Sequence, residues 1–265
     1  MLIQYPVHTI QTGEIQTAYR SIGEGEPIIL IMAVGGTMSA WDRRLLLKLS
    51  SGYRLILFDN RGIGDSSGEE LECSIPAMAE DVFHLMDMLG LSDAHIFGYS
   101  MGSMIGLQLA ALHPEKVRSL LLCCVSKDGG DTYTRIEPWI NTSRPEIIAF
   151  QARFPPAFLN EHKDLRKIFP PSSHPVHPST IFRQLNAINQ WNLDIESLAT
   201  ITMPVLILAG TEDIITPLEE GRKIASAISS AQVIPIEGGG HGMMYQYTDR
   251  IATLALDFLS VMNRS

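Results

Sequence analysis

The amino-acid sequence predicts an α/β protein with a mostly parallel sheet covered by helices, and three observations carry this prediction. Short, apolar, β-branched runs alternate with segments whose apolar residues recur at helical spacing. The 265 residues are 45% hydrophobic and 18% charged, which is enough to form a large core without disulfides or metal ions. One stretch, residues 126–200, interrupts the alternation. These features favour a single sheet domain that contains one insertion.

The first two expected strands are residues 7–11 and 15–22, joined by a turn at Gly13 and Glu14. The later strands are apolar along their whole length, which is typical of parallel strands buried on both faces. These later strands are expected at residues 28–34, 54–58, 95–97, 119–125, 205–209 and 232–236.

Helical segments separate or follow these strands. Residues 75–89 carry apolar residues at helical spacing and are followed by Gly90, a residue type that commonly terminates helices. Further helices are expected at residues 101–112, 218–228 and 245–262. Helices that connect consecutive strands in this way produce parallel neighbours in a sheet.

Residues 126–200 contain eight of the 15 prolines but only two of the 21 glycines, and no run typical of a buried strand. Short helical patterns occur at residues 146–153 and 181–191. We therefore predict a core domain of residues 1–125 and 201–265, interrupted by a helical cap at residues 126–200. The cap has eight basic and eight acidic residues, so the net charge of −9 belongs to the core domain.

Composition argues against several classes of protein. A net charge of −9 disfavours binding to nucleic acids or anionic membranes, and the longest apolar stretch, residues 28–34, is far too short to span a bilayer. Cys73, Cys123 and Cys124 have neither the spacing of a zinc site nor that of a disulfide framework. No signal peptide is visible. We expect a cytoplasmic protein that uses no metal and no cofactor, and its oligomeric state is left open.

The sharpest local pattern is G-x-S-x-G at Gly98, Ser100 and Gly102, between a predicted strand and a predicted helix. A sharp turn there strains the backbone of the serine, and the two glycines remove side chains that would collide. The hydroxyl group then lies at a helix N-terminus, where free N–H groups favour an oxyanion. We predict that Ser100 is a nucleophile; the alternative is an ordinary turn before a helix.

A serine nucleophile needs a base and a carboxylate that orients the base. Among the eight histidines, His241 is the best candidate because it lies in a glycine-rich loop after the last predicted strand. Asp213 is the candidate carboxylate, since it follows the strand at residues 205–209, and Glu212 is its competitor. The alternatives are a surface histidine and a turn-forming aspartate.

Two backbone amides are candidates for stabilising the oxyanion of a tetrahedral intermediate. The amide of Met101 directly follows the predicted nucleophile. The amide of Val34 lies beside Gly35 and Gly36, where small residues leave room for a substrate. The alternative for Val34 is that it only ends the preceding strand.

The chain resembles the α/β-hydrolase superfamily, in the branch with a helical cap. Five segments carry the resemblance in the family's order: residues 30–36, 58–66, 98–102, 210–213 and 240–242. Serine, aspartate and histidine also follow one another as they do in that family. Two positions depart from the usual pattern, because Met32 and Ala33 replace a common His-Gly pair and Ser103 replaces a common glycine. Asp59 and Arg61, in the second segment, are expected to be structural.

The resemblance implies the α/β-hydrolase fold and a serine hydrolase that cleaves a small-to-medium, largely apolar carboxylic ester or lactone through an acyl-enzyme on Ser100. Carbon–carbon bond hydrolysis and cofactor-free perhydrolysis with the same triad are alternatives, as is a non-catalytic small-molecule receptor. Dehalogenation is disfavoured, because it places an aspartate at position 100.

Aromatic and sulfur-containing side chains are expected to line the substrate pocket, unless they pack a core of their own. These candidates are Trp139, Phe150, Phe154, Phe158, Trp191 and Met243.

Overall fold

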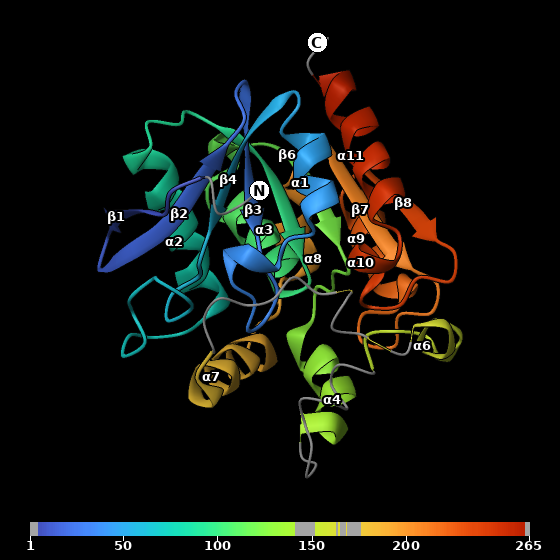
Figure 1. Ribbon diagram of the computed structural model, residues 1–265. Coiled ribbons are helices and arrows are strands. Elements are labelled where there is room, and N and C mark those ends of the chain that lie inside the picture. Colours follow the sequence, from blue (N-terminus) through green and yellow to red (C-terminus); the bar gives the residue numbers. More distant parts are fainter. Residues whose placement is uncertain (1–4, 141–151, 163, 165–167, 169–175, 263–265) are drawn as a thin grey trace.

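The computed structural model describes residues 5–140, 152–162, 164, 168 and 176–262. Its centre is a sheet of eight strands in the order β1-β2-β4-β3-β5-β6-β7-β8 (Figure 1). The strands are β1 (His8–Thr12), β2 (Ile15–Ile22), β3 (Glu26–Ile31), β4 (Tyr53–Phe58), β5 (Ala94–Tyr99), β6 (Val117–Cys123), β7 (Val205–Gly210) and β8 (Ala231–Ile236). Strand β2 runs antiparallel to β1 and β4, and all other neighbours are parallel. The predicted, mostly parallel sheet is confirmed.

Each predicted strand is present, but several strand ends differ from the prediction. The strand expected at residues 28–34 ends at Ile31, before the turn at Gly35, whose φ of 66° a strand cannot accommodate. The strand expected at residues 119–125 ends at Cys123, because Cys124 has a φ of 57°. A residue in the left-handed region breaks the pleat of a strand, and apolar composition alone does not reveal it.

The helices of the sheet domain cover both faces of the sheet (Figure 1). They are α1 (Arg43–Leu49), α2 (Ile75–Met88), α3 (Met101–Leu112), α9 (Leu218–Ala227), α10 (Met243–Gln246) and α11 (Thr248–Met262). Ile29 and Ile31 of β3 pack with α2, α3 and α9 in one core cluster, whereas Ile28 and Leu30 pack with α1 and α11 in the other. Alternate side chains of a strand point to opposite faces, so both faces must be apolar.

Two helical features differ from the sequence-based expectation. The seven residues of α1 were not predicted, because two turns give too short a periodic pattern. The single helix expected at residues 245–262 is divided into α10 and α11 by Tyr247, whose φ of −124° and ψ of 36° lie outside the helical region.

Residues 126–200, called the helical insertion below, connect β6 to β7. Their described part contains α4 (Gly129–Ile140), α6 (Pro156–Glu161), α7 (Pro178–Asn189) and α8 (Ile195–Ala199). Helices α4, α6 and α7 lie together below the sheet in Figure 1. Helix α7 corresponds to the pattern at residues 181–191, while most of the predicted segment 146–153 lies outside the described residues. That the insertion acts as a cap stays a proposal.

Hydrogen bonds connect the two ends of the insertion to each other and to the sheet domain. The N–H of Gly129 donates to the carbonyl of Trp191, 2.8 Å away. A Cβ atom at Gly129 would collide with the carbonyl of Ile188, so glycine permits this close approach. The indole N–H of Trp191 in turn donates to Oε1 of Gln108 in α3, at 2.8 Å. In the described part of the chain, no helix has the length and hydrophobicity needed to cross a membrane.

Candidate active site

Ser100 occupies a strained turn between β5 and α3. Its φ of 54° and ψ of −116° are unusual for any residue with a side chain. A Cβ atom at Gly102 would collide with the carbonyl of Ile31, and one at Gly98 would lie 2.5 Å from the Cα atom of Ser103. Both glycines are therefore required for the helix to start this close to the sheet. The N–H of Ser100 donates to the carbonyl of Cys123 at 2.9 Å, which fixes the turn to β6.

The structure brings together the three residues that the sequence singled out. Nε2 of His241 lies 2.9 Å from Oγ of Ser100, and Nδ1 of His241 lies 2.9 Å from Oδ2 of Asp213. These side chains come from the loops that follow β8, β5 and β7, at the carboxyl edge of the sheet. A carboxylate only accepts hydrogen bonds, so Nδ1 carries the proton and Nε2 faces the serine hydroxyl as an acceptor.

Asp213 is held by four hydrogen bonds. Oδ1 accepts from the amides of Ile215 and Thr216, at 2.8 and 2.9 Å. Oδ2 accepts from Oγ1 of Thr216 at 2.8 Å and from His241. Burial raises the pKa of Asp213, but the charge and hydrogen bond of His241 and the bonds from Thr216 outweigh burial, so the pKa lies below its usual value. The competing residue, Glu212, is exposed.

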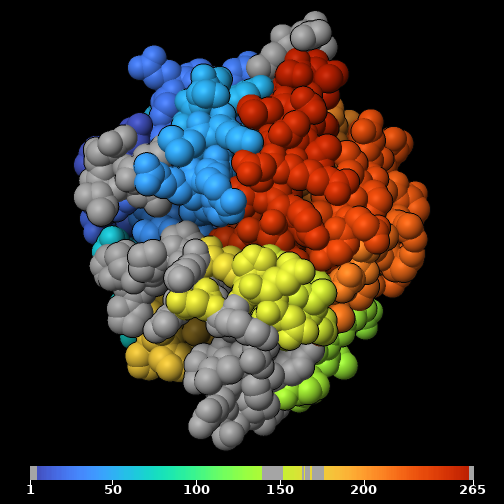
Figure 2. Space-filling view, turned by 45° about the vertical axis from the view of Figure 1, so that its right-hand side comes forward, coloured from blue at the N-terminus to red at the C-terminus, as the bar shows by residue number. Residues whose placement is uncertain are grey.

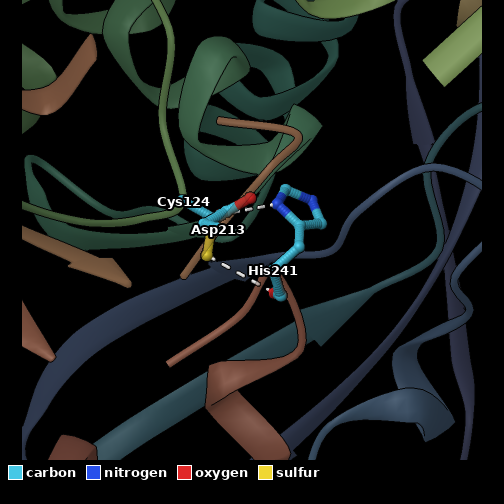
Figure 3. A group of neighbouring side chains, drawn as sticks. All are labelled: Cys124, Asp213 and His241. Atoms are coloured by element: carbon cyan, nitrogen blue, oxygen red, sulfur yellow. Dashed lines mark hydrogen bonds and ion pairs between the residues drawn. The ribbon is translucent and has the colours of Figure 1, made fainter. Parts of the chain in front are cut away.

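The main-chain carbonyl of His241 accepts hydrogen bonds from two side chains. The Tyr99 hydroxyl donates to this oxygen at 2.7 Å, and the Cys124 thiol donates to it at 3.4 Å. Figure 3 shows the Cys124 thiol directed at this carbonyl while the Asp213 carboxylate meets the imidazole. Neither Tyr99 nor Cys124 was predicted from the sequence to support the loop that carries His241. Because Tyr99 occupies a variable position of G-x-S-x-G and Cys124 lies in an apolar run, neither carried a local signal.

Cys124, Asp213 and His241 also form a group whose possible ligand atoms lie within 4.8 Å of one another. A metal site would need the thiolate form of Cys124. Burial and the neighbouring Asp213 carboxylate raise the pKa of the Cys124 thiol well above its usual range, and the thiol donates its hydrogen to a carbonyl. Nδ1 of His241 is already bonded to Asp213. Cys124 and Asp213 are therefore better suited to supporting the loop of residues 237–242, called the histidine loop below, than to binding a metal ion together with His241.

The other side of the histidine loop rests on the helical insertion. The N–H of Gly242 donates to the carbonyl of Arg153 at 2.6 Å. A Cβ atom at Gly242 would collide with the ring of Phe154, and one at Gly240 would lie 2.6 Å from the Arg153 carbonyl. The glycines on both sides of His241 therefore allow the insertion to pack directly against the loop. Figure 2 shows the same neighbourhood from outside, with the yellow surface of α6 against the red surface of the C-terminal helices.

The two predicted oxyanion donors lie on adjacent backbone segments. Met101 is the first residue of α3, so its N–H has no acceptor within the helix. Val34 is half-buried in the loop after β3. The packing of Gly102 against Ile31 holds the end of β3 against the start of α3. Their catalytic role stays a proposal.

Two of the predicted pocket residues lie near the histidine loop. Phe154 is buried, and its ring contacts the position of Gly242. Phe158 stacks on Phe154, with ring centroids 4.9 Å apart, and on His162, at 4.0 Å. Phe158 also lines a cavity of about 330 Å³ beside Tyr245, and this cavity is not lined by Ser100.

The other predicted pocket residues either belong to the core or lie outside the described residues. Trp191 belongs to the core cluster that contains α3, and Met243 belongs to the cluster on the opposite face of the sheet. Both side chains are buried: Trp191 follows the end of α7, and Met243 is the first residue of α10. A role for either residue in the substrate pocket stays a prediction. The side chain of Trp139 and the whole of Phe150 lie outside the described residues.

The expectation that Arg61 is structural is confirmed. Its guanidinium group binds both carboxylate oxygens of Asp81, at 2.6 and 2.7 Å, and the carbonyl of Ala77 at 3.0 Å. Ser103, at a position where the family commonly has glycine, donates from its hydroxyl to the carbonyl of Cys123 at 2.9 Å. A small hydroxyl side chain therefore fits between α3 and β6.

Comparisons with known proteins identify the family. Residues 26–155 match the family described as alpha/beta hydrolase fold, and residues 184–261 match the one described as TAP-like protein. A hydrolase of Pseudomonas aeruginosa PA01, whose crystal structure is solved, is 26% identical with a TM-score of 0.84, over 96% of this chain and 98% of that chain. The chain belongs to the α/β-hydrolase family. The predicted fold class is thereby confirmed.

Two further proteins resemble this α/β hydrolase over most of its length. The enol-lactonase of Burkholderia xenovorans LB400 is 23% identical with a TM-score of 0.82, covering 96% of this chain and 100% of that chain, and it shares the fold. A protein of Caulobacter sp. (strain K31) named "Putative carbamate hydrolase RutD" is 27% identical over 274 residues, covering 95% of this chain and 98% of that protein.

Proposed function

We propose that this α/β hydrolase is a serine hydrolase that cleaves a small-to-medium, largely apolar carboxylic ester or lactone through an acyl-enzyme on Ser100. The observation that carries the proposal is the relay from Ser100 through His241 to Asp213, in which both hydrogen bonds measure 2.9 Å. A serine hydroxyl becomes an effective nucleophile when a base accepts its proton and a carboxylate orients that base.

In the first half-reaction, Oγ of Ser100 attacks the substrate carbonyl while Nε2 of His241 accepts the hydroxyl proton. Asp213 stabilises the imidazolium that forms, and its low pKa keeps it in the carboxylate form. The amides of Met101 and Val34 donate to the oxyanion of the tetrahedral intermediate. When the intermediate collapses, His241 returns the proton to the leaving alcohol, and an ester of Ser100 remains.

In the second half-reaction, His241 accepts a proton from water, and the resulting hydroxide attacks the acyl-enzyme. Collapse of the second tetrahedral intermediate releases the acid and returns the proton to Ser100. A lactone follows the same course, except that the leaving alcohol stays attached to the acid.

The helical insertion is proposed as the cap that shapes the acyl pocket. Support comes from Phe154, which is buried against the histidine loop, and from α7, which contacts the loop that carries Val34. Because the relative from Caulobacter is named a carbamate hydrolase, carbamates join the acyl compounds worth assaying. A cytoplasmic location stays a prediction, which fractionation of the native host would test.

The decisive experiment is labelling with a fluorophosphonate probe, which reacts with an activated serine. Wild-type protein is expected to be labelled, and Ser100→Ala is expected to be unlabelled with an unchanged circular dichroism spectrum. Absence of labelling in the wild type would support the receptor alternative instead.

The reaction class follows from an assay of p-nitrophenyl esters of increasing acyl length beside lactones and a carbamate. We expect the highest kcat/KM for a short or medium apolar ester or a lactone. Matched assays with a 1,3-diketone substrate and with hydrogen peroxide plus a carboxylic acid test the two alternative reactions. Faster turnover in either of these assays would overturn the ester assignment while retaining the serine mechanism.

A further inference from the structure

Gln184 of α7 reaches across to the loop that carries Val34. Its Oε1 accepts a hydrogen bond from the N–H of Gly35, 2.8 Å away. An N–H group only donates, so the atom that faces Gly35 is the amide oxygen and the NH₂ group points elsewhere. Gly35 directly follows Val34, whose N–H is the proposed oxyanion donor.

The NH₂ group of Gln184 has no acceptor in the described part of the chain. The residue is fully buried, with 0% of its surface exposed. Buried amide donors are normally bonded, because leaving one without a partner costs free energy. The nitrogen and oxygen of an amide are about 2.3 Å apart, so Nε2 lies within about 5 Å of the Gly35 nitrogen.

Two neighbouring side chains hold α7 against the sheet domain. Ile181, one turn earlier in α7, packs over Gly35, where an added Cβ would lie 3.4 Å from its Cγ1 atom. Arg183 donates to the carbonyl of Leu71 in the sheet domain. With α7 held in this way, the bond from the Gly35 N–H to Oε1 orients the Gln184 amide before any ligand binds, which favours specific recognition.

We propose that Gln184 is a specificity-determining residue whose Nε2 donates to a second carbonyl oxygen of the acyl substrate, beside the carbonyl that Ser100 attacks. This inference rests on the proposed function. Val34 and Gly35 are adjacent and Nε2 lies within about 5 Å of the Gly35 nitrogen, so one substrate molecule can present an oxygen to Nε2 while its scissile carbonyl faces the Val34 N–H. A neutral carbonyl satisfies the buried donor without bringing a charge into the interior. The substrate class is therefore a 3-oxo-acyl ester or a lactone with an equivalent oxygen.

The test measures binding of two matched esters, methyl 3-oxohexanoate and methyl hexanoate, by titration calorimetry. Ser100→Ala protein is used, so that neither ester is turned over. In this background we expect Gln184→Met to weaken binding of the 3-oxo ester at least about fivefold and of the plain ester less than about twofold. Gln190→Met, at the exposed C-terminal end of the same helix, is the control and is expected to change neither affinity.

Gln184→Glu separates substrate recognition from support of the loop. This variant keeps an oxygen for the Gly35 N–H but replaces the NH₂ group, so the preference for the 3-oxo ester is expected to disappear near neutral pH. An equal loss for both esters in Gln184→Met, an unchanged preference in both variants, or no measurable preference in the parent protein would overturn the proposal. Probe labelling of wild-type Ser100 tests the proposed function separately, so the two failures are distinguishable.

Discussion

The hydroxyl of Tyr99 donates a 2.7 Å hydrogen bond to the main-chain carbonyl of His241. Tyr99 directly precedes Ser100, so one side chain connects the strand that presents the predicted nucleophile to the loop that presents the predicted base. The two rings also lie close, with centroids 5.9 Å apart. The distance between Ser100 and His241 therefore depends on a contact that involves neither of their side chains.

Tyr99→Phe is expected to lower both stability and activity. The variant leaves the buried carbonyl of His241 with only the weak thiol donor of Cys124, at a cost of about 1–3 kcal/mol in the free energy of unfolding. The freed loop is expected to reduce kcat about tenfold with little change in KM. Urea unfolding and steady-state kinetics measure the two effects.

Tyr245→Phe is the matched control. Its hydroxyl donates to the carbonyl of Ala40 at 2.9 Å, so the variant loses a similar hydrogen bond without touching the carbonyl of His241. A stability loss of the same size is expected with kcat unchanged. Equal loss of activity in both variants would show that Tyr99 has no positioning role.

Thr216→Val is expected to raise the pKa of Asp213 toward its usual value, because the ionised carboxylate loses a hydrogen bond. The variant removes the hydroxyl that donates to Oδ2 at 2.8 Å, and a hydrogen bond to a charged group contributes about 1.5–3 kcal/mol. The pKa of Asp213 is lowered in the folded protein, so its ionisation stabilises the fold above pH 4 and this contribution disappears as the pH falls below that value. The difference in unfolding free energy between wild type and variant should be largest near pH 7 and shrink below pH 4. Thr253→Val, on the exposed face of α11, should show no such pH dependence.

Gly102→Ala is expected to disrupt the start of α3. Its Cβ would collide with the carbonyl of Ile31, which belongs to the sheet and cannot rotate away as a side chain can. We expect a loss of about 3 kcal/mol or more in the free energy of unfolding, with activity reduced in the protein that still folds. Gly106→Ala is the control in the same helix, because its Cβ would meet side-chain atoms alone, the Cγ2 atom of Ile96 at 3.2 Å and Cδ2 atoms of Leu120 and Leu122 at 3.7 Å, and alanine favours the helix. Thermal unfolding of both variants tests the comparison, and similar melting temperatures would contradict it.

The burial of His95 is expected to make the protein less stable in mild acid. The side chain is fully buried in β5 and bonded to Ser119 at 2.7 Å. Burial lowers its pKa, against the opposing effect of Glu26. The unfolded chain therefore takes up a proton near pH 6.5 before the folded one does, and stability is lost as the pH falls through this value. His95→Gln should flatten the dependence of unfolding free energy on pH between 7 and 5, and an unchanged slope would count against this assignment.

The sequence predicts the sheet and the proximity of Ser100, Asp213 and His241 because their determinants are local. Parallel strands are apolar along their length since both faces are covered, and the turn at Ser100 needs glycines at fixed offsets. The contacts that side chains of the helical insertion make cannot be predicted in this way. Phe154 and Trp191 are both large aromatic residues in a proline-rich stretch, yet the first rests on the histidine loop and the second bonds to Gln108. Only the packing of distant segments decides between such outcomes, so Gln184 also carried no signal in the sequence.

The contact of residues 153–155 with Gly240 and Gly242 has a consequence for protein engineering. Exchanging the whole of residues 126–200 for the insertion of another hydrolase would also replace the backbone on which the loop of His241 rests. A chimera that retains the short segment 153–155 and varies only the helices on either side should keep its chemistry while its substrate range changes. The boundary between the catalytic machinery and the exchangeable module thus runs through the insertion, and does not coincide with the ends of the insertion.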